Sequence, residues 1–200
     1  MNMGKAIVTV AALGLMWLGY VAWPLYDLYV LVNALENRDV ATVVRQVYFD
    51  SVRRSLADQI LTAYVQRTGV QLSPRLQGVA ATALVIADPV LSKVISPEAL
   101  TEFLNTGWPV TVVPEVPPGT VGISSKGLGN AWQVFAASEY GFARFSISLP
   151  QSVSRTHRFT LTFKLLRWQW ELTSITLPES IQNLLADELV KAMKVPPRRP

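Results

Sequence analysis

The sequence predicts an α+β protein: an N-terminal transmembrane helix, then helices packed on a curved antiparallel sheet of about four strands, and a final helix. The first observation behind this prediction is the uncharged apolar run Ala6–Tyr26. The second is the helical spacing of apolar residues through the first half of the chain, and the third is a period-two alternation in the second half. Helices followed by a series of strands are typical of the α+β class.

The composition limits the chemistry that the protein can perform. The chain has 200 residues, of which 50% are hydrophobic and only 16% are charged, which argues against intrinsic disorder. There is no cysteine, and His157 is the only histidine. Thiolate nucleophiles, cysteine-ligated metals and multi-histidine metal sites are therefore excluded. No glycine-rich phosphate-binding motif is present, so a nucleotide cofactor is not indicated. From the residue types and motifs together we predict no metal site and no cofactor.

The run Ala6–Tyr26 is long enough to cross a bilayer, which needs about 20 apolar residues. Aromatic residues gather toward its C-terminal end, and amphipathic rings favour the membrane interface. The predicted interface residues are Trp17, Tyr20, Trp23 and Tyr26. Lys5 precedes the run, and Asp27 is the first charge after it. The positive end should stay in the cytoplasm, so we expect a single-pass protein of a bacterial inner membrane with a periplasmic C-terminal domain.

This interpretation divides the chain into an anchor (1–27), a domain (28–195) and a disordered basic tail (196–200). Two alternatives stay open for the apolar run. One is a cleaved signal peptide, although the best cleavage site, after Ala22, has the bulky Tyr20 at its −3 position. The other is a buried core helix.

Helices are expected through the first half of the domain. Each has apolar residues three or four apart, and several begin with Asp or Ser, whose side chains cap free N–H groups. The predicted helices are Tyr26–Asn37, Val40–Val47 (capped by Asp39), Ser51–Arg67 (capped by Asp50 and ended by Gly69), Leu76–Ala87, and a helix from Pro97 to about Asn105 (capped by Ser96 and ended by Gly107).

The second half of the domain begins with a long loop and continues as strands. Gly107–Asn130 is rich in proline and glycine and reads as a loop with a short strand at Val110–Val113. The predicted strands are Trp132–Ser138 and Phe142–Leu149, joined by a turn at Glu139–Gly141, then His157–Leu165, and a last strand from Trp168 to Leu177 with a bulge near Thr173–Ser174. A helix over Glu179–Met193 follows.

The alternation in the strands predicts one buried sheet face. Phe159, Leu161 and Phe163 lie on one side of their strand, and Thr160 and Thr162 lie on the other. We expect the apolar side, together with two tryptophans of the last strand, to be buried against the second domain helix. The expected core contacts join Phe159, Leu161, Phe163, Trp168 and Trp170 to Leu56, Ile60 and Tyr64.

Two segments carry a family resemblance: WPLYDLYVLVNALENRDVATVVRQVYFDSVRRSL (Trp23–Leu56) and RWQWELTSITLP (Arg167–Pro178). Together they resemble the bacterial domain-of-unknown-function family 2939 of membrane-anchored proteins. The resemblance implies a bacterial envelope protein and supplies no catalytic residues. The order of helices and bent sheet is also similar to the cone-shaped fold of nuclear transport factor two and ketosteroid isomerase. In that fold the sheet and helices enclose a pocket, an analogy that carries no function by itself.

The leading functional hypothesis is binding. A mostly apolar pocket in the mouth of the cone would take a small apolar ligand, with Gly107–Asn130 as its lid, and an envelope protein is the other possible partner. Nucleic acid is not expected. The predicted ligand-binding residues are Tyr64, Trp132, Phe142, His157, Phe159 and Trp170.

Several alternatives to this hypothesis remain. An enzyme could use the same cavity with Asp50 or His157, but a helix cap and a strand-end histidine explain these residues equally, and Asp88 before Pro89 is expected in a turn or cap. A purely structural partner in envelope assembly is the third class. From Lys126 to Arg167 there are six bases and one acid, Glu139, a balance of +5 that could favour anionic lipid headgroups or an acidic partner.

Overall fold

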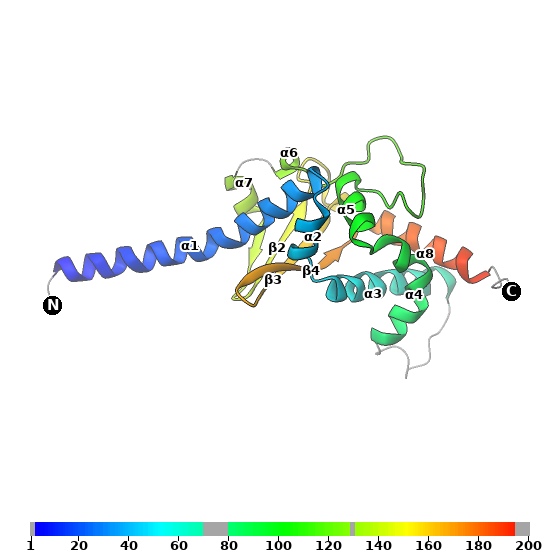
Figure 1. The fold of residues 1–200 in the computed structure, drawn as a ribbon, viewed down its shortest axis with the longest axis horizontal. Coiled ribbons are helices and arrows are strands. Elements are labelled where there is room, and N and C mark those ends of the chain that lie inside the picture. The colour runs from blue at the N-terminus through cyan, green and yellow to red at the C-terminus, as the bar shows by residue number, and fades with distance from the viewer. Residues whose placement is uncertain (1–2, 70–79, 129–130, 195–200) are drawn as a thin grey trace.

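The computed structural model describes residues 3–69, 80–128 and 131–194. It confirms the α+β class: a long apolar N-terminal helix, further helices, a four-stranded antiparallel sheet and a C-terminal helix (Figure 1). The helices are α1 (Met3–Glu36), α2 (Val40–Gln46), α3 (Phe49–Thr68), α4 (Ala80–Val94), α5 (Pro97–Thr106), α6 (Ser125–Leu128), α7 (Ala131–Ala136) and α8 (Glu179–Lys194). The strands are β1 (Ser138–Tyr140), β2 (Arg144–Leu149), β3 (Phe159–Leu166) and β4 (Gln169–Thr176), with a short 3-10 helix at Arg155–His157.

Helix α1 has two parts with different surroundings. Its N-terminal part projects from the rest of the molecule (Figure 1), and every residue from 7 to 19 is exposed. Its C-terminal part is in the core, where Leu28, Leu31, Val32 and Leu35 are fully buried. By length and composition the segment Ile7–Glu36 could cross a membrane. Because the turns after Asp27 are used in the core, and Tyr20 and Leu25 also pack against it, the part of α1 that is exposed throughout ends at residue 19.

The predicted caps of α2 and α5 are confirmed. The carboxylate of Asp39 accepts hydrogen bonds from the backbone N–H of Thr42 at 3.1 Å and from its hydroxyl at 2.6 Å. These bonds, the hydroxyl first, lower the pKa of Asp39 below its usual value. Ser96 accepts from the N–H of Ala99 in the same way. Gly69 and Gly107 end α3 and α5 in the left-handed conformation, as expected.

The predicted cap of α3 is wrong, because the N-cap is Tyr48 and Asp50 lies inside the first turn. The backbone N–H of Tyr48 donates to the carbonyl of Leu172 in β4, at 2.9 Å. This bond to the sheet places the start of α3 two residues earlier than the capping pattern suggests.

The predicted end of the helix Leu76–Ala87 is also wrong. Helix α4 continues through Asp88 and Pro89 to Val94, and the predicted residues before position 80 lie outside the described part of the chain. A proline inside a helix removes the hydrogen bond to the carbonyl four residues earlier, here that of Val85. Val85 is 76% exposed, so water can satisfy this carbonyl. Asp88 therefore lies on a helix rather than in a turn.

The strands follow one another in the order β1-β2-β3-β4, each antiparallel to the next. Their common face is apolar, and the alternation predicted for β3 is confirmed. The buried residues of this face are Phe145, Ile147, Leu149, Phe159, Leu161, Phe163, Trp170, Leu172 and Ile175. Thr162 pairs with Ser174 while Phe163 pairs with Leu172, so Thr173 is the extra residue of a bulge, as predicted.

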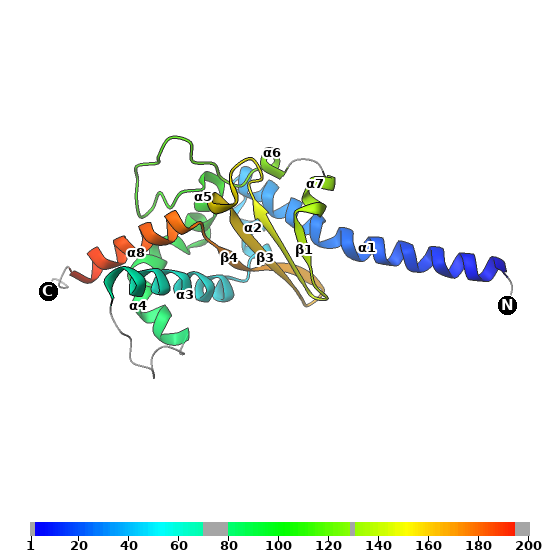
Figure 2. The ribbon, with the colours of Figure 1, turned by 180° about the vertical axis from the view of Figure 1, so that it is seen from behind.

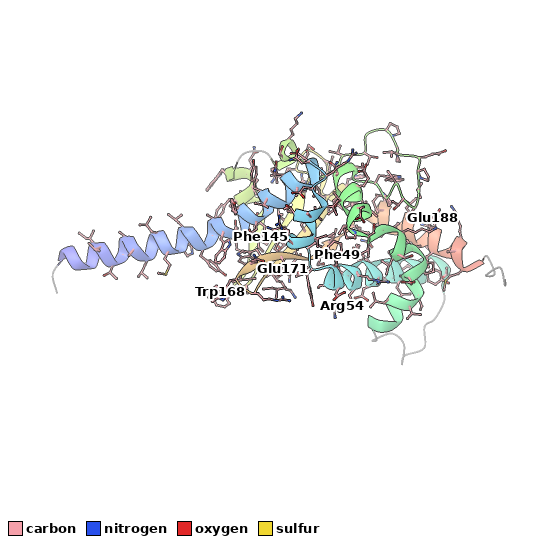
Figure 3. All side chains as sticks on the ribbon, viewed as in Figure 1. Phe49, Arg54, Phe145, Trp168, Glu171 and Glu188 are labelled. Carbon is pink, nitrogen blue, oxygen red and sulfur yellow. The ribbon has the colours of Figure 1, made fainter. Side chains whose placement is uncertain are left out.

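The core contains the expected partners with one exception. Leu56 and Ile60 are buried in the same cluster as Phe159, and Tyr64 packs against this cluster while half-buried. Trp168 does not join them. It forms the β3–β4 turn with Arg167, both with positive φ, and is 80% exposed (Figure 3). Because Leu166 pairs with Gln169, only these two residues are left to reverse the chain.

Three further predictions in the second half are wrong. Most of the predicted strand Trp132–Ser138 belongs to helix α7. Trp132 and Phe135 are three residues apart, so in a helix they lie on one face, where their rings stack with centroids 5.6 Å apart. The β1–β2 turn lies at residues 141–143 rather than 139–141. Residues 110–112 form a turn closed by bonds to the carbonyl of Pro109 and not a strand. The predicted tail 196–200 lies outside the described residues.

The open edge of β4 is covered by three separate segments. Asp27 of α1 accepts from the N–H of Trp170 at 3.3 Å, and the bond from Tyr48 comes next along the edge. Gln59 of α3 follows, donating to the carbonyl of Ile175 at 2.8 Å and accepting from the N–H of Leu177 at 2.8 Å. Edge groups that could pair with another chain are thereby satisfied within this one.

Candidate functional site

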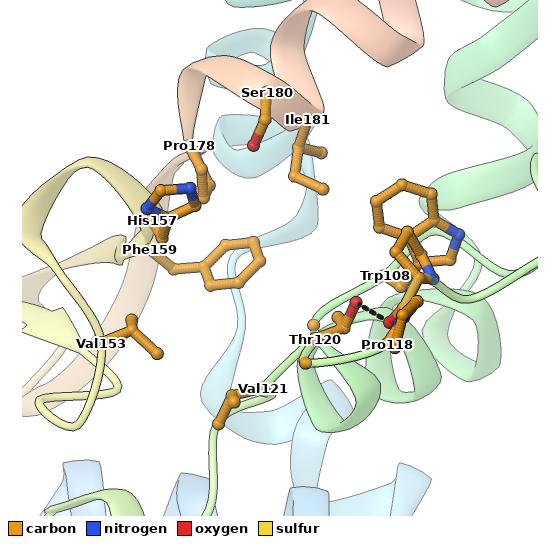
Figure 4. A pocket seen from close by; sticks show the side chains of 13 residues that line it. Trp108, Pro118, Thr120, Val121, Val153, His157, Phe159, Pro178, Ser180 and Ile181 are labelled. Atoms are coloured by element: carbon orange, nitrogen blue, oxygen red, sulfur yellow. Dashed lines mark hydrogen bonds between the residues drawn. The ribbon is translucent and has the colours of Figure 1, made fainter.

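A pocket of about 580 Å³ lies at the end of the sheet where β3 begins and β4 ends (Figure 4). Three segments enclose it: the loop after α5, the β2–β3 connection, and the first turn of α8. Most of the lining side chains are apolar. The lining residues are Gly107, Trp108, Pro117, Pro118, Gly119, Thr120, Val121, Val153, His157, Phe159, Pro178, Ser180 and Ile181.

The sheet side of the pocket is formed by side chains of the core. Phe159 is only 2% exposed and lies edge-on against Phe103 of α5, with ring centroids 5.7 Å apart and an interplanar angle of 82°. Ile181 and Pro178 are also buried. These side chains belong to the core and the pocket wall at once, so the wall keeps its shape without a ligand.

The loop side is held by its own hydrogen bonds. The indole Nε1 of Trp108 donates to the carbonyl of Val113 at 2.9 Å, and the hydroxyl of Thr120 donates to the carbonyl of Pro117 at 2.8 Å (Figure 4 shows the second bond). The loop then returns to α5, where the N–H of Ile123 donates to the carbonyl of Leu104 at 2.8 Å. These bonds fold the loop on itself and tie it to α5, and the loop forms one wall of the pocket.

Gly122 is required for that return. A Cβ built on Gly122 would collide with the backbone carbonyl of Asn105. Gly107, with φ of 73°, lies against the same part of the loop, and a Cβ on it would lie 2.5 Å from the carbonyl oxygen of Val121. Two backbones touch here because neither residue has a side chain.

The polar side chains of the pocket are few, and none of them is an acid, a lysine or an arginine among the described lining residues. His157 is exposed, and its Nδ1 lies 2.7 Å from the hydroxyl oxygen of Ser154 and 3.1 Å from that of Thr156. Ser180 and Thr120 add hydroxyl groups. No Asp, Glu or Tyr is among the described residues that line this pocket. The arrangement offers hydrogen bonds at the rim of an apolar space.

A second hollow, of about 680 Å³, lies between α3 and α4 and is more polar. Asp50 and Tyr48 line it, together with an ion pair between Arg53 and Asp88. Arg54 donates from its Nε to the carbonyl of Asp50 at 3.1 Å. Asp50 and His157, the two acid–base candidates, thus lie in different hollows and cannot act together.

Of the six predicted ligand-binding residues, the structure brings two together, His157 and Phe159. Tyr64 lies on α3 against the core, and Trp170 is buried beside Tyr20 of α1, with ring centroids 6.3 Å apart. Two others are exposed away from this pocket: Trp132 on α7 and Phe142 in the β1–β2 turn.

Sequence reasoning missed Trp108 and Ile181 as lining residues. Trp108 follows the glycine that ends α5, and a large aromatic residue at the start of a long loop was a usable signal. Ile181 lies in the first turn of α8 and is buried, so its helical pattern indicates a core residue as much as a pocket residue. In the part of the chain that the structure describes, no three His, Asp or Glu side chains gather to hold a metal ion.

The comparisons with known proteins agree with the resemblance seen in the sequence. No curated protein and no solved structure matches the chain, so the similarity to the cone-shaped fold stays a prediction. Residues 13–103 match the family described as "Protein of unknown function (DUF2939)". The match contains the whole first segment, Trp23–Leu56, and ends before the second, Arg167–Pro178. Over residues 13–103, from the exposed part of α1 into α5, the resemblance to the DUF2939 family is therefore confirmed.

Proposed function

We propose that this chain is a single-pass protein of a bacterial inner membrane whose periplasmic domain binds a small, mostly apolar ligand. The observation that supports binding is the pocket between the loop after α5 and the end of the sheet. Its volume of about 580 Å³ lies within the usual range for small-molecule sites. Apolar walls with a few hydroxyl groups and one imidazole at the rim are also typical of such sites.

Binding is favoured over catalysis by the surroundings of His157. A histidine base is usually oriented by a carboxylate, and a nucleophile lies within hydrogen-bond reach. Here the neighbours of the imidazole are the hydroxyls of Ser154 and Thr156, next to it in the chain. The same hydrogen bonds fix the turn before β3, which is a sufficient structural reason for them.

The anchor is supported by the exposed apolar part of α1 and by the charges around it, Lys5 before and Asp27 after. A reporter that is active only in the periplasm, fused after Arg199, should be active. Mass spectrometry of the protein from the membrane fraction should give the mass of a chain that still carries its N-terminal segment. A soluble product beginning at Trp23 would contradict the anchor and support a cleaved signal peptide.

Ligand binding can be tested by filling the pocket. Ser180 lies at the pocket and is exposed, so a tryptophan there should occupy the space without disturbing the core. Glu179, its exposed neighbour, does not line the pocket and provides the matched control, Glu179→Trp. Native mass spectrometry of full-length protein with added decanol should show a bound molecule in the wild type and in Glu179→Trp, and none in Ser180→Trp. Equal binding by all three would contradict the proposal.

A further inference from the structure

Two hairpin turns lie at the same end of the sheet. Arg144, the first residue of β2, pairs with Lys164, two residues before the end of β3. The β1–β2 turn and the β3–β4 turn must therefore be neighbours, and Figure 2 shows them together. The side chains at these turns are Phe142, Arg144, Arg167 and Trp168, which we call the hairpin rim.

The hairpin rim lies at the end of the domain from which α1 projects (Figures 2 and 3). Trp170, two residues after the turn, contacts α1 in two places: its ring packs on Tyr20, and its N–H donates to Asp27. The rim is thus level with the last turns of the exposed part of α1. This is the part of α1 where the predicted membrane span ends.

The chemistry of the rim suits the surface of a bilayer. Phe142 is 94% exposed and Trp168 is 80% exposed, although large aromatic side chains are usually buried. Both sit beside an exposed arginine, and no ion pair within the described part of the chain includes Arg144 or Arg167. Aromatic rings prefer the headgroup layer, and guanidinium groups bind phosphate oxygens.

Acidic groups near the rim are few and set back from it. Glu171 of β4 lies opposite Lys164 of β3 and is half-buried. Glu139 of β1 lies opposite Ser146 of β2. The charged residues nearest to the two turns are therefore Arg144 and Arg167, and both acidic residues lie further from the end of the domain.

We propose that the hairpin rim rests in the phospholipid headgroup layer beside α1, so that the domain has a fixed orientation on the membrane. This inference depends on the membrane anchor of the proposed function. β3 then leads away from the rim, and its eight residues at about 3.3 Å each separate the pocket from the rim by about 25 Å along the strand. The pocket then opens to water, and its ligand arrives from the aqueous side rather than from the bilayer.

The absence of cysteine makes this orientation measurable in the full-length chain. Single cysteines are introduced as Leu13→Cys in α1, Ala143→Cys in the β1–β2 turn, and Ser152→Cys in the β2–β3 connection beside the pocket; all three positions are exposed. Each carries a fluorophore, and one chain is placed in each lipid nanodisc, which excludes contact with a second copy. Quenching by headgroup-labelled and chain-labelled nitroxide lipids reports the depth of each site.

The proposal expects quenching by chain-labelled lipid at position 13, by headgroup-labelled lipid at 143, and by neither at 152. Adding Phe142→Ser and Trp168→Ser should remove most of the quenching at 143 and leave position 13 unchanged. Val116→Ser, an exposed apolar residue of the loop after α5, is the matched control and should change nothing. A lipid-embedded position 13 with position 143 in water would overturn this inference and leave the anchor intact. Loss of quenching at position 13 would overturn both.

Discussion

The carboxylate of Asp27 accepts a hydrogen bond of 3.3 Å from the backbone N–H of Trp170, and both residues are buried. The bond joins the helix that leaves the domain to the last strand of the sheet, 143 positions later in the chain. Because α1 is continuous through this contact, its exposed part and the sheet should move as one body. The direction in which the helix leaves the domain is fixed by the core and not by a linker.

Replacing Asp27 with leucine should destabilise the domain by about 1–3 kcal/mol, because the N–H of Trp170 would stay buried without an acceptor. Asp27→Asn keeps an amide oxygen and should cost less. Chemical unfolding of the detergent-solubilised full chain measures both variants. If Asp27→Leu were as stable as the wild type, water would have to reach this N–H. The bond would then not hold α1 and the sheet together as one body.

Gln59 makes the corresponding contact further along β4, with one bond accepted and one donated. Gln59→Leu should cost about 1–3 kcal/mol because it leaves a carbonyl and an N–H of the strand edge unpaired. Gln66→Leu, an exposed glutamine of the same helix, is the control and should change stability little. The same unfolding measurement applies. Equal effects of the two substitutions would mean that the edge of β4 is not protected by Gln59.

The fold class and most helices could be predicted because local patterns decide them. The cap at Asp39, the glycine that ends α5 and the alternation from Phe159 to Phe163 each depend on neighbouring residues in the chain. The bulge at Thr173 was also visible, since the apolar phase shifts by one residue there.

The errors occur where distant residues decide the outcome. The start of α3 depends on a bond from Tyr48 to Leu172, which no local pattern records. The exposure of Trp168 follows from the pairing of Leu166 with Gln169, which leaves it in the turn. The pocket was harder still, because it joins a loop near position 120, a strand start near 159 and a helix start near 180. Its sheet side, at His157 and Phe159, and the neighbouring loop Gly107–Asn130 were predicted, but the part contributed by the start of α8 was not.

Leu161 provides a test of the core. It is fully buried at the centre of the apolar face of the sheet. Leu161→Ala should cost about 2–5 kcal/mol, since the substitution removes buried methyl groups and leaves a cavity. Lys164→Ala, at an exposed position of the same strand, should have little effect on unfolding. A similar loss in both variants would argue against the observed register of β3.

The cap at Asp39 predicts a dependence of stability on acid. Its hydrogen bonds from Thr42 lower the pKa in the folded state below the usual 3.8. The contribution to stability is therefore fully present above about pH 4 and is lost as the pH falls through the folded-state pKa. Asp39→Asn, which can cap but does not titrate, should lack this part of the acid dependence. Unfolding of the two proteins across acidic pH gives the comparison, and parallel curves would contradict the cap's role.

Gly122 links the fold to the proposed binding site. An alanine there places a Cβ against the carbonyl of Asn105, so the loop must move away from α5 or the helix end must shift. Overpacking of this kind costs about 1–3 kcal/mol, and the wall formed by Trp108 and Val121 should open. Gly141→Ala is the control, since its Cβ would make only an ordinary contact, 3.5 Å from the carbonyl oxygen of Arg144. We expect Gly122→Ala to lower the unfolding midpoint and to lose bound decanol in native mass spectrometry, while Gly141→Ala does neither. If Gly122→Ala were destabilised yet kept the ligand, the loop after α5 would not be part of the binding site.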